Sequence, residues 1–165
     1  MILALSMAAF LVFTWSMRAL FFNFPAFILS YTIGEILVIA AYMLAFALLE
    51  TLMVILVMVL LAVILPGALL REGFSYKASF CFITFAAISI HLQYVMTNQP
   101  NISYLALELG RALILWLIPV LLVRFVSVVR KVVMEVLDRL TIFSYIYLPL
   151  GIISLFVVII RLLWR

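Results

Sequence analysis

The stretch AFILSYTIGEILVIAAYMLAFALLETLMVILVMVLLAVILPGALL, residues 26–70, decides the class of fold. A helix needs about 20 apolar residues to cross the hydrocarbon core of a bilayer. At 45 residues, this stretch is too long for one ordinary span. We therefore expect two helices, 26–48 and 51–70, joined by a tight turn near Glu50. Since no Gly or Pro marks that turn, one long bent helix ending at Pro66–Gly67 is the competing assignment.

The composition of the whole chain agrees with a lipid environment. Of its 165 residues, 71% are hydrophobic and 10% are charged, and the mean hydropathy is +1.48. Soluble domains average about 45–50% apolar and about 25% charged residues. Ten basic and six acidic side chains are too few to cover a soluble globule of this size. The expected fold is an all-α polytopic membrane bundle, with residues 1–165 forming a single transmembrane domain.

The scarcity of reactive residues excludes several chemistries. Cys81 and His91 are the only cysteine and the only histidine, so one copy of the chain cannot build a disulfide framework, a cysteine-ligated cluster or a bis-histidine haem. GxGxxG, GxxxxGK and HExxH motifs are absent from the sequence. The net charge of +4 would suit nucleic acid, but the basic residues cluster at the ends of apolar segments, as in membrane proteins. We expect no enzyme, no metal site and no nucleic-acid partner.

Charges, prolines and Asn/Gln runs divide the rest of the chain. The predicted spans are 1–22, 78–96, 102–123 and 142–164, which with the two central helices makes six; five spans is the alternative. The first span is expected to end at Asn23-Phe24-Pro25, because proline lacks an N–H and restricts the residue before it. Polar loops are expected at 71–77 and 97–101.

The segment RFVSVVRKVVMEVLDRL, residues 124–140, has an amphipathic pattern. Polar residues recur every three or four positions, so they share one helical face. We expect a helix lying in the membrane interface, while continuation of the preceding span into water is the alternative. Four basic side chains would contact lipid phosphates: Arg124, Arg130, Lys131 and Arg139.

The basic residues also predict an orientation. With six spans, seven basic residues fall in connections on one side of the membrane and only Arg161 and Arg165 on the other. The positive-inside rule assigns the first side to the cytoplasm. Loops 71–77 and 124–140 are therefore expected on the cytoplasmic side and both termini on the opposite side, in a bacterial or organellar inner membrane.

Ionisable residues within the spans are the candidate functional residues, because an unpaired charge is costly in lipid. Glu35 lies in the second predicted span, and Glu108 and Arg111 lie at overlapping depth in the fifth. We expect Arg111 to bridge Glu108 on its own helix and Glu35 across a helix interface. His91 and Gln93, near the outer end of the fourth span, are expected to join this intramembrane cluster.

Two pairs of small residues support contact between the second and fifth spans. Ser30 and Gly34 are four residues apart beside Glu35, and Ala106 and Gly110 are four apart beside Arg111. Small residues at this spacing let helix backbones approach closely. We therefore expect these four residues to form a helix-packing interface.

The cluster admits three roles: a neutralised ion network that fixes helix register, a proton or ion relay, or recognition of an anionic lipid or quinone headgroup through Arg111. His91 suits a hydrogen-bonded packing role, a quinone contact or single ligation of a tetrapyrrole magnesium. The expected function is a non-catalytic subunit that packs against membrane lipids and other integral membrane proteins in a larger complex, such as an energy-converting one. The alternative is a small transporter or channel that uses the Glu/Arg/His cluster.

Overall fold

The computed structural model describes residues 2–64, 73–98 and 103–164. This part of the chain forms five α-helices and no strand: α1 (Ile2–Ser30), α2 (Ile33–Ile64), α3 (Phe74–Asn98), α4 (Ser103–Phe125) and α5 (Ser127–Leu163). Among them, α1, α2, α3 and α5 are long and apolar enough to cross a membrane, and in α4 the apolar part is shorter, Gly110–Val123. The expected all-α class is confirmed and the helices fit an integral membrane protein, whereas six spans are not seen.

Helix α1 runs through Asn23 and Pro25, where the sequence predicts a break. A proline inside a helix removes one backbone hydrogen bond. Leaving the helix within hydrocarbon would expose many more unsatisfied backbone groups, so the helical path costs less. Asn23 Nδ2 also donates to Ala19 O at 2.8 Å. The helix ends only at Ser30, eight residues beyond the predicted limit of 22.

Glu35 marks the start of α2. Its Oε2 accepts hydrogen bonds from Thr32 N at 2.8 Å and from Thr32 Oγ1 at 2.9 Å. A Glu three residues after a Thr that bonds back to the Thr N–H is one half of a capping box, which satisfies a backbone donor at a helix N-terminus. The boundary between the first two helices is therefore the turn at Tyr31 and Thr32.

Helix α2 continues without interruption through Glu50 to Ile64. Residues 35–64 contain neither Gly nor Pro, and a turn within them would leave backbone groups unpaired in lipid. The predicted turn near Glu50 is therefore wrong. The spans predicted at 26–48 and 51–70 are replaced by the end of α1 and one long α2, while residues 65–72 lie outside the described part of the chain.

Helix α5 joins the predicted amphipathic segment to the last predicted span. The break falls at Val126, whose backbone is extended (φ −111°, ψ 104°), and 37 residues then form one helix. At 1.5 Å per residue this helix is roughly 56 Å long, against about 30 Å for the hydrocarbon core. The segment 124–140 is thus neither a separate interfacial helix nor an extension of the preceding span: most of it is the first part of α5.

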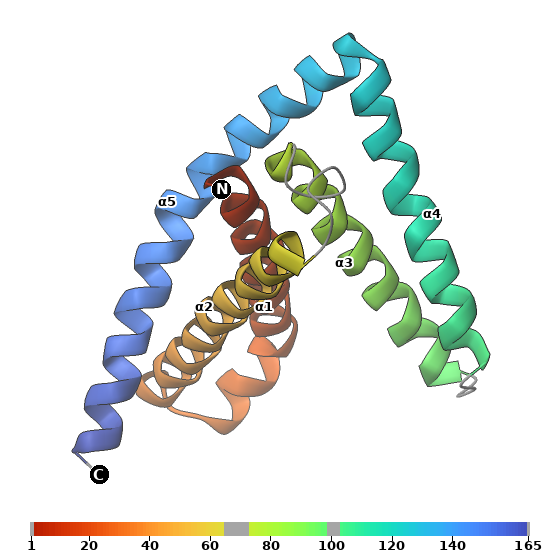
Figure 1. Ribbon diagram of the computed structural model, residues 1–165. Coiled ribbons are helices and arrows are strands. Elements are labelled where there is room, and N and C mark those ends of the chain that lie inside the picture. Colours follow the sequence, from red (N-terminus) through yellow and green to blue (C-terminus); the bar gives the residue numbers. More distant parts are fainter. Residues whose placement is uncertain (1, 65–72, 99–102, 165) are drawn as a thin grey trace.

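Helices α1, α2 and α5 pack on one another, α3 packs on α1, and α4 packs mainly on α3. Figure 1 shows the α3–α4 pair diverging from the lower parts of α1, α2 and α5. The N-terminal end of α1 lies near the first turns of α3, and the C-terminal end of α5 lies at the opposite end of the molecule (Figure 1). The two ends of the described part of the chain therefore lie at opposite ends of the molecule.

The interface of α1, α2 and α5 is built around small side chains. Gly151 of α5 is buried, and a Cβ placed on it would lie 2.9 Å from Phe13 Cζ and 3.0 Å from Leu48 Cβ. Ser6 Oγ donates to Ser144 Oγ at 3.2 Å across the α1–α5 contact. Small residues and hydroxyl hydrogen bonds are the usual means by which membrane helices approach closely. This three-helix unit is the scaffold on which α3 and α4 are placed.

Candidate functional site

The candidate site is a set of three polar side chains between α3 and α4, here called the α3–α4 polar cluster: His91, Glu108 and Arg111. Glu108 is only 4% exposed. Its Oε1 accepts a hydrogen bond from Arg111 Nη1 at 2.5 Å, one turn along the same helix. His91 Nε2 of α3 lies 3.5 Å from the same oxygen. One buried carboxylate thus holds two basic side chains from two helices.

The cluster lies near the end of α3 and near the beginning of α4. Glu108 comes five residues after the first residue of α4, or roughly 8 Å along the helix, and His91 comes seven residues before the end of α3, or roughly 10 Å by the same rise. Arg111 reaches back toward the nearer helix end to meet Glu108. The side chains of His91 and Arg111 nevertheless remain 49% and 55% exposed. The cluster therefore has a buried acidic centre and an exposed basic edge.

Glu35 is not part of this cluster, so the predicted bridge from Arg111 to Glu35 is wrong. Glu35 is exposed at the first turn of α2, where it caps that helix. In Figure 1 the start of α2 and the α3–α4 pair lie on different parts of the molecule. The error comes from the span boundaries: counting depth from residue 26 placed Glu35 in mid-membrane, whereas its helix begins at Ile33.

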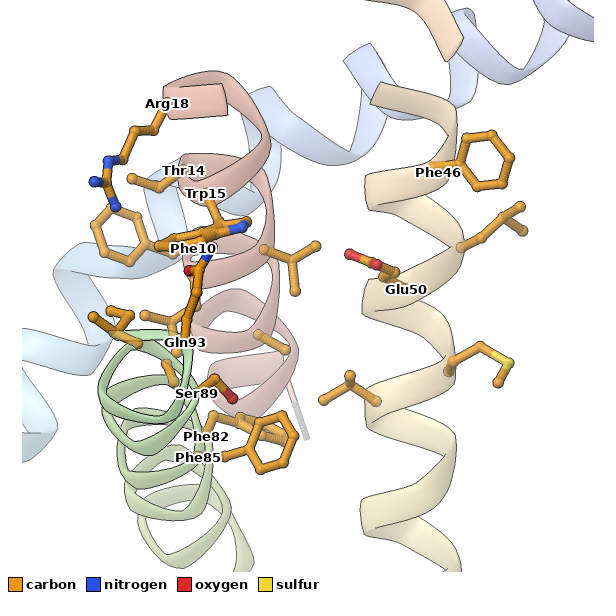
Figure 2. A pocket seen from close by; sticks show the side chains of 18 residues that line it. Phe10, Thr14, Trp15, Arg18, Phe46, Glu50, Phe82, Phe85, Ser89 and Gln93 are labelled. Carbon is orange, nitrogen blue, oxygen red and sulfur yellow. The ribbon is translucent and has the colours of Figure 1, made fainter. Parts of the chain in front are cut away.

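Gln93 lies on a different face of α3 from His91, because residues two apart point to different sides of a helix. It lines a pocket between α1, α2 and α3 together with Arg18 and Glu50. Figure 2 shows Gln93 and Ser89 on α3, Arg18 on α1, and Glu50 pointing from α2 toward the space between the helices. Sequence inspection alone did not single out Arg18 or Glu50, which it assigned to span boundaries.

The four small residues predicted to join the second and fifth spans do not form a close interface in the described part of the chain. Ser30 is exposed, and a Cβ added to Gly34 or to Gly110 would meet no atom within 4 Å. The side chain of Ala106 lies outside the described residues. The close approach occurs instead at Gly151, and the signal for it is the spacing of Ser144, Gly151 and Ser154 on one face of α5, all of them buried.

A second polar contact joins the start of α3 to the middle of α4. Trp116 Nε1 of α4 donates to the backbone oxygen of Lys77, in the first turns of α3, at 3.1 Å. The pair is therefore joined by the polar cluster and, on α3, near the helix start by this hydrogen bond from the middle of α4.

Three of the four predicted lipid-contacting residues lie on the first part of α5, and the fourth, Arg124, is in the last turn of α4. Arg130, Lys131 and Arg139 are exposed, while the side chain of Arg124 lies outside the described residues. Arg139 Nη2 donates to Glu135 Oε1 at 2.7 Å, an exposed pair four residues apart. Such a surface ion pair adds little stability.

With Glu35 elsewhere, the α3–α4 polar cluster consists of one carboxylate in contact with one guanidinium and one imidazole. The described residues hold no group of three or more His, Cys, Asp or Glu side chains that could bind a metal ion. No protein-family model matches the chain, and comparison with curated proteins and with solved structures found no match.

Proposed function

We propose that the chain is a non-catalytic subunit of a larger membrane complex, such as an energy-converting one, and that its α3–α4 pair docks against a partner membrane protein. The observation that carries this proposal is the exposed basic edge of the polar cluster. His91 and Arg111 are fixed on buried Glu108 but leave about half of their side-chain surface uncovered. Facing lipid, such groups would be costly. A polar surface on a partner would remove that cost.

The rest of α4 is consistent with a docking helix. Leu113, Ile114 and Leu117 are exposed, and α4 packs mainly against α3. Association between membrane helices is driven by close packing at small residues and by polar pairs, because apolar side chains gain little by leaving lipid. The polar cluster would therefore supply the specificity of docking. The apolar residues around it would supply a surface complementary in shape to the partner.

The basic residues favour an orientation in which the N-terminal end of α1 and the connection between α4 and α5 lie on the cytoplasmic side. Lys77 near the start of α3, and Arg130 and Lys131 near the start of α5, lie toward that end of the molecule. The C-terminal end of α5, with Arg161, would then lie on the opposite side. The membrane would be a bacterial or organellar inner membrane.

Gentle extraction from native membranes tests the subunit role. The tagged full chain should migrate on a native gel in a complex that contains other polypeptides. Replacing Arg111 with Gln should reduce that complex, whereas replacing Arg139 with Gln, an exposed control on α5, should leave it unchanged. A homogeneous monomer or homo-oligomer free of other polypeptides would contradict the proposal.

A small transporter or channel is the second candidate function. The contact between His91 and Glu108 favours it, since a histidine beside a carboxylate can pass a proton. Purified chain in vesicles that contain a pH-sensitive dye should then dissipate an imposed proton gradient, and His91→Gln should abolish the flux. No flux above that of protein-free vesicles would leave the subunit role as the better account.

A further inference from the structure

A pocket between α1, α2 and α3 is separate from the polar cluster and from the proposed docking surface. Its volume is about 810 Å³, which lies within the range of about 300–1,000 Å³ typical of small-molecule sites. Figure 2 shows the side chains that line it, with α2 on one side and α1 and α3 on the other. A molecule dissolved in the bilayer is the natural occupant of a site between membrane helices.

The lining is rich in aromatic rings. Five aromatic residues from all three helices contribute to it: Phe10, Trp15, Phe46, Phe82 and Phe85. Aromatic side chains bind flat rings through offset-stacked and edge-to-face contacts, in addition to the gain from burying apolar surface. The lining therefore suits a ligand with a flat ring and an apolar tail.

Two charged side chains of opposite sign line the same pocket. Arg18 of α1 lies over the Trp15 ring, 5.0 Å from its centroid. Glu50 of α2 points into the space between the helices (Figure 2), and it forms no hydrogen bond or ion pair with the residues that the structure describes. The pocket thus offers a guanidinium donor from α1 and a carboxyl group from α2.

The depth of these two residues restricts the class of ligand. Arg18 lies 16 residues after the start of α1 and 12 before its end, or roughly 24 Å and 18 Å along the helix. Glu50 lies 17 residues after the start of α2 and 14 before its end, or roughly 26 Å and 21 Å. Both lie near the middle of their helices, so in helices that cross a bilayer they would lie near its midplane, where a phospholipid headgroup does not reside but a neutral polar ring does.

We propose that this pocket binds an isoprenoid quinone or its quinol. The ring would lie among the aromatic side chains, a quinone carbonyl oxygen would accept a hydrogen bond from Arg18, and a quinol hydroxyl would donate one to Glu50. The isoprenoid tail would follow the apolar remainder of the lining into the bilayer. The site lies within one copy of the chain, so it does not rest on the proposed subunit role.

Fluorescence of Trp15 provides the test. The variant Trp116→Phe with Trp164→Phe leaves Trp15 as the only tryptophan, and the purified full chain is placed in phosphatidylcholine nanodiscs. A short-tailed ubiquinone or menaquinone should quench Trp15 saturably. The matched variant Trp15→Phe with Trp164→Phe, which keeps Trp116, should show only the linear quenching caused by quinone dissolved in the bilayer. Linear quenching in both variants would overturn the proposal.

Variants in the same single-tryptophan background locate the site. Arg18→Gln and the pocket-filling Ala86→Phe should each weaken quinone binding about tenfold or more, while Arg139→Gln, outside the pocket, should not change it. Circular dichroism checks that each variant remains helical. Arg18→Gln removes a hydrogen-bond donor, whereas Ala86→Phe fills the pocket. If one of these variants misfolds, the other still tests the site. Equal binding by every folded variant, or displacement of the quinone by added anionic phospholipid, would contradict a quinone site.

Discussion

Substitution of Gly151 by Ala tests the packing of α1, α2 and α5 most sharply. The added Cβ would lie 2.9 Å from Phe13 Cζ and 3.0 Å from Leu48 Cβ, at least about 0.5 Å inside the optimal separation of 3.5–4.0 Å between carbon atoms. Phe13 is fully buried and its ring stacks on Tyr147 at a centroid distance of 5.2 Å, so it has little room to move. Overpacking of this kind costs about 1–3 kcal/mol.

Gly110 supplies the matched control, because a Cβ there would meet no atom within 4 Å. Both Gly→Ala changes lie inside helices and share a propensity gain of up to about 1 kcal/mol. The difference between the two variants therefore isolates the steric cost. Denaturation by sodium dodecyl sulfate in mixed micelles, followed by circular dichroism, should show Gly151→Ala less stable than Gly110→Ala by about 1–3 kcal/mol. Equal stability of the two variants would refute the close packing at Gly151.

Three further changes probe the polar contacts. In a double-mutant cycle measured by the same denaturation assay, Ser6→Ala and Ser144→Ala should show a coupling energy of about 0.6 kcal/mol, the average for hydrogen bonds between membrane helices. Additive effects of the two substitutions would mean that the hydroxyls do not form a hydrogen bond. Glu108→Leu should destabilise the chain, because it removes the carboxylate that links α3 and α4, and adding Arg111→Leu should recover part of that loss. The charge exchange Glu35→Arg with Arg111→Glu should be no more stable than the single variants, since Glu35 caps α2 far from the cluster. A double variant more stable than the single variants would show that Glu35 and Arg111 do interact.

The sequence predicted α3 and α4 better than the other three helices. Predicted spans 78–96 and 102–123 correspond to α3 (Phe74–Asn98) and α4 (Ser103–Phe125), because the run of polar residues near 97–101 leaves little choice of boundary. At Pro25 the sequence predicts a break, whereas α1 continues through it. Hydrocarbon favours an uninterrupted helix so strongly that proline is tolerated inside it.

The correct boundary near residue 32 was present in the sequence as a local signal. Thr32 and Glu35 are spaced as in a capping box, but Glu35 had been interpreted as a charge buried in a span. Placing Glu35 within a span also led to the prediction of an ion pair between Glu35 and Arg111. The contact between Glu108 and Arg111 was easier to foresee because residues three apart on one helix are neighbours.

Long-range packing could not be derived from residue spacing alone. Gly34 and Gly110 carried the same small-residue pattern as Gly151, yet only Gly151 lies against neighbouring helices. Which glycine lies in a close helix–helix contact depends on which face of each helix packs against its neighbours. The aromatic pocket likewise depends on α1, α2 and α3 meeting, and its residues are scattered from 8 to 93 along the chain.

Site-specific photo-cross-linking in native membranes tests the central claim, that the α3–α4 pair docks on a partner protein. Leu115 lies four residues after Arg111, on the same face of α4, and is 52% exposed; Leu56 of α2 is comparably exposed at 57% and serves as the control. A photoreactive residue at position 115 should link the chain to a second polypeptide, and the adduct should be lost with Arg111→Gln. At position 56 only lipid adducts are expected. Lipid adducts alone at both positions would contradict the subunit role.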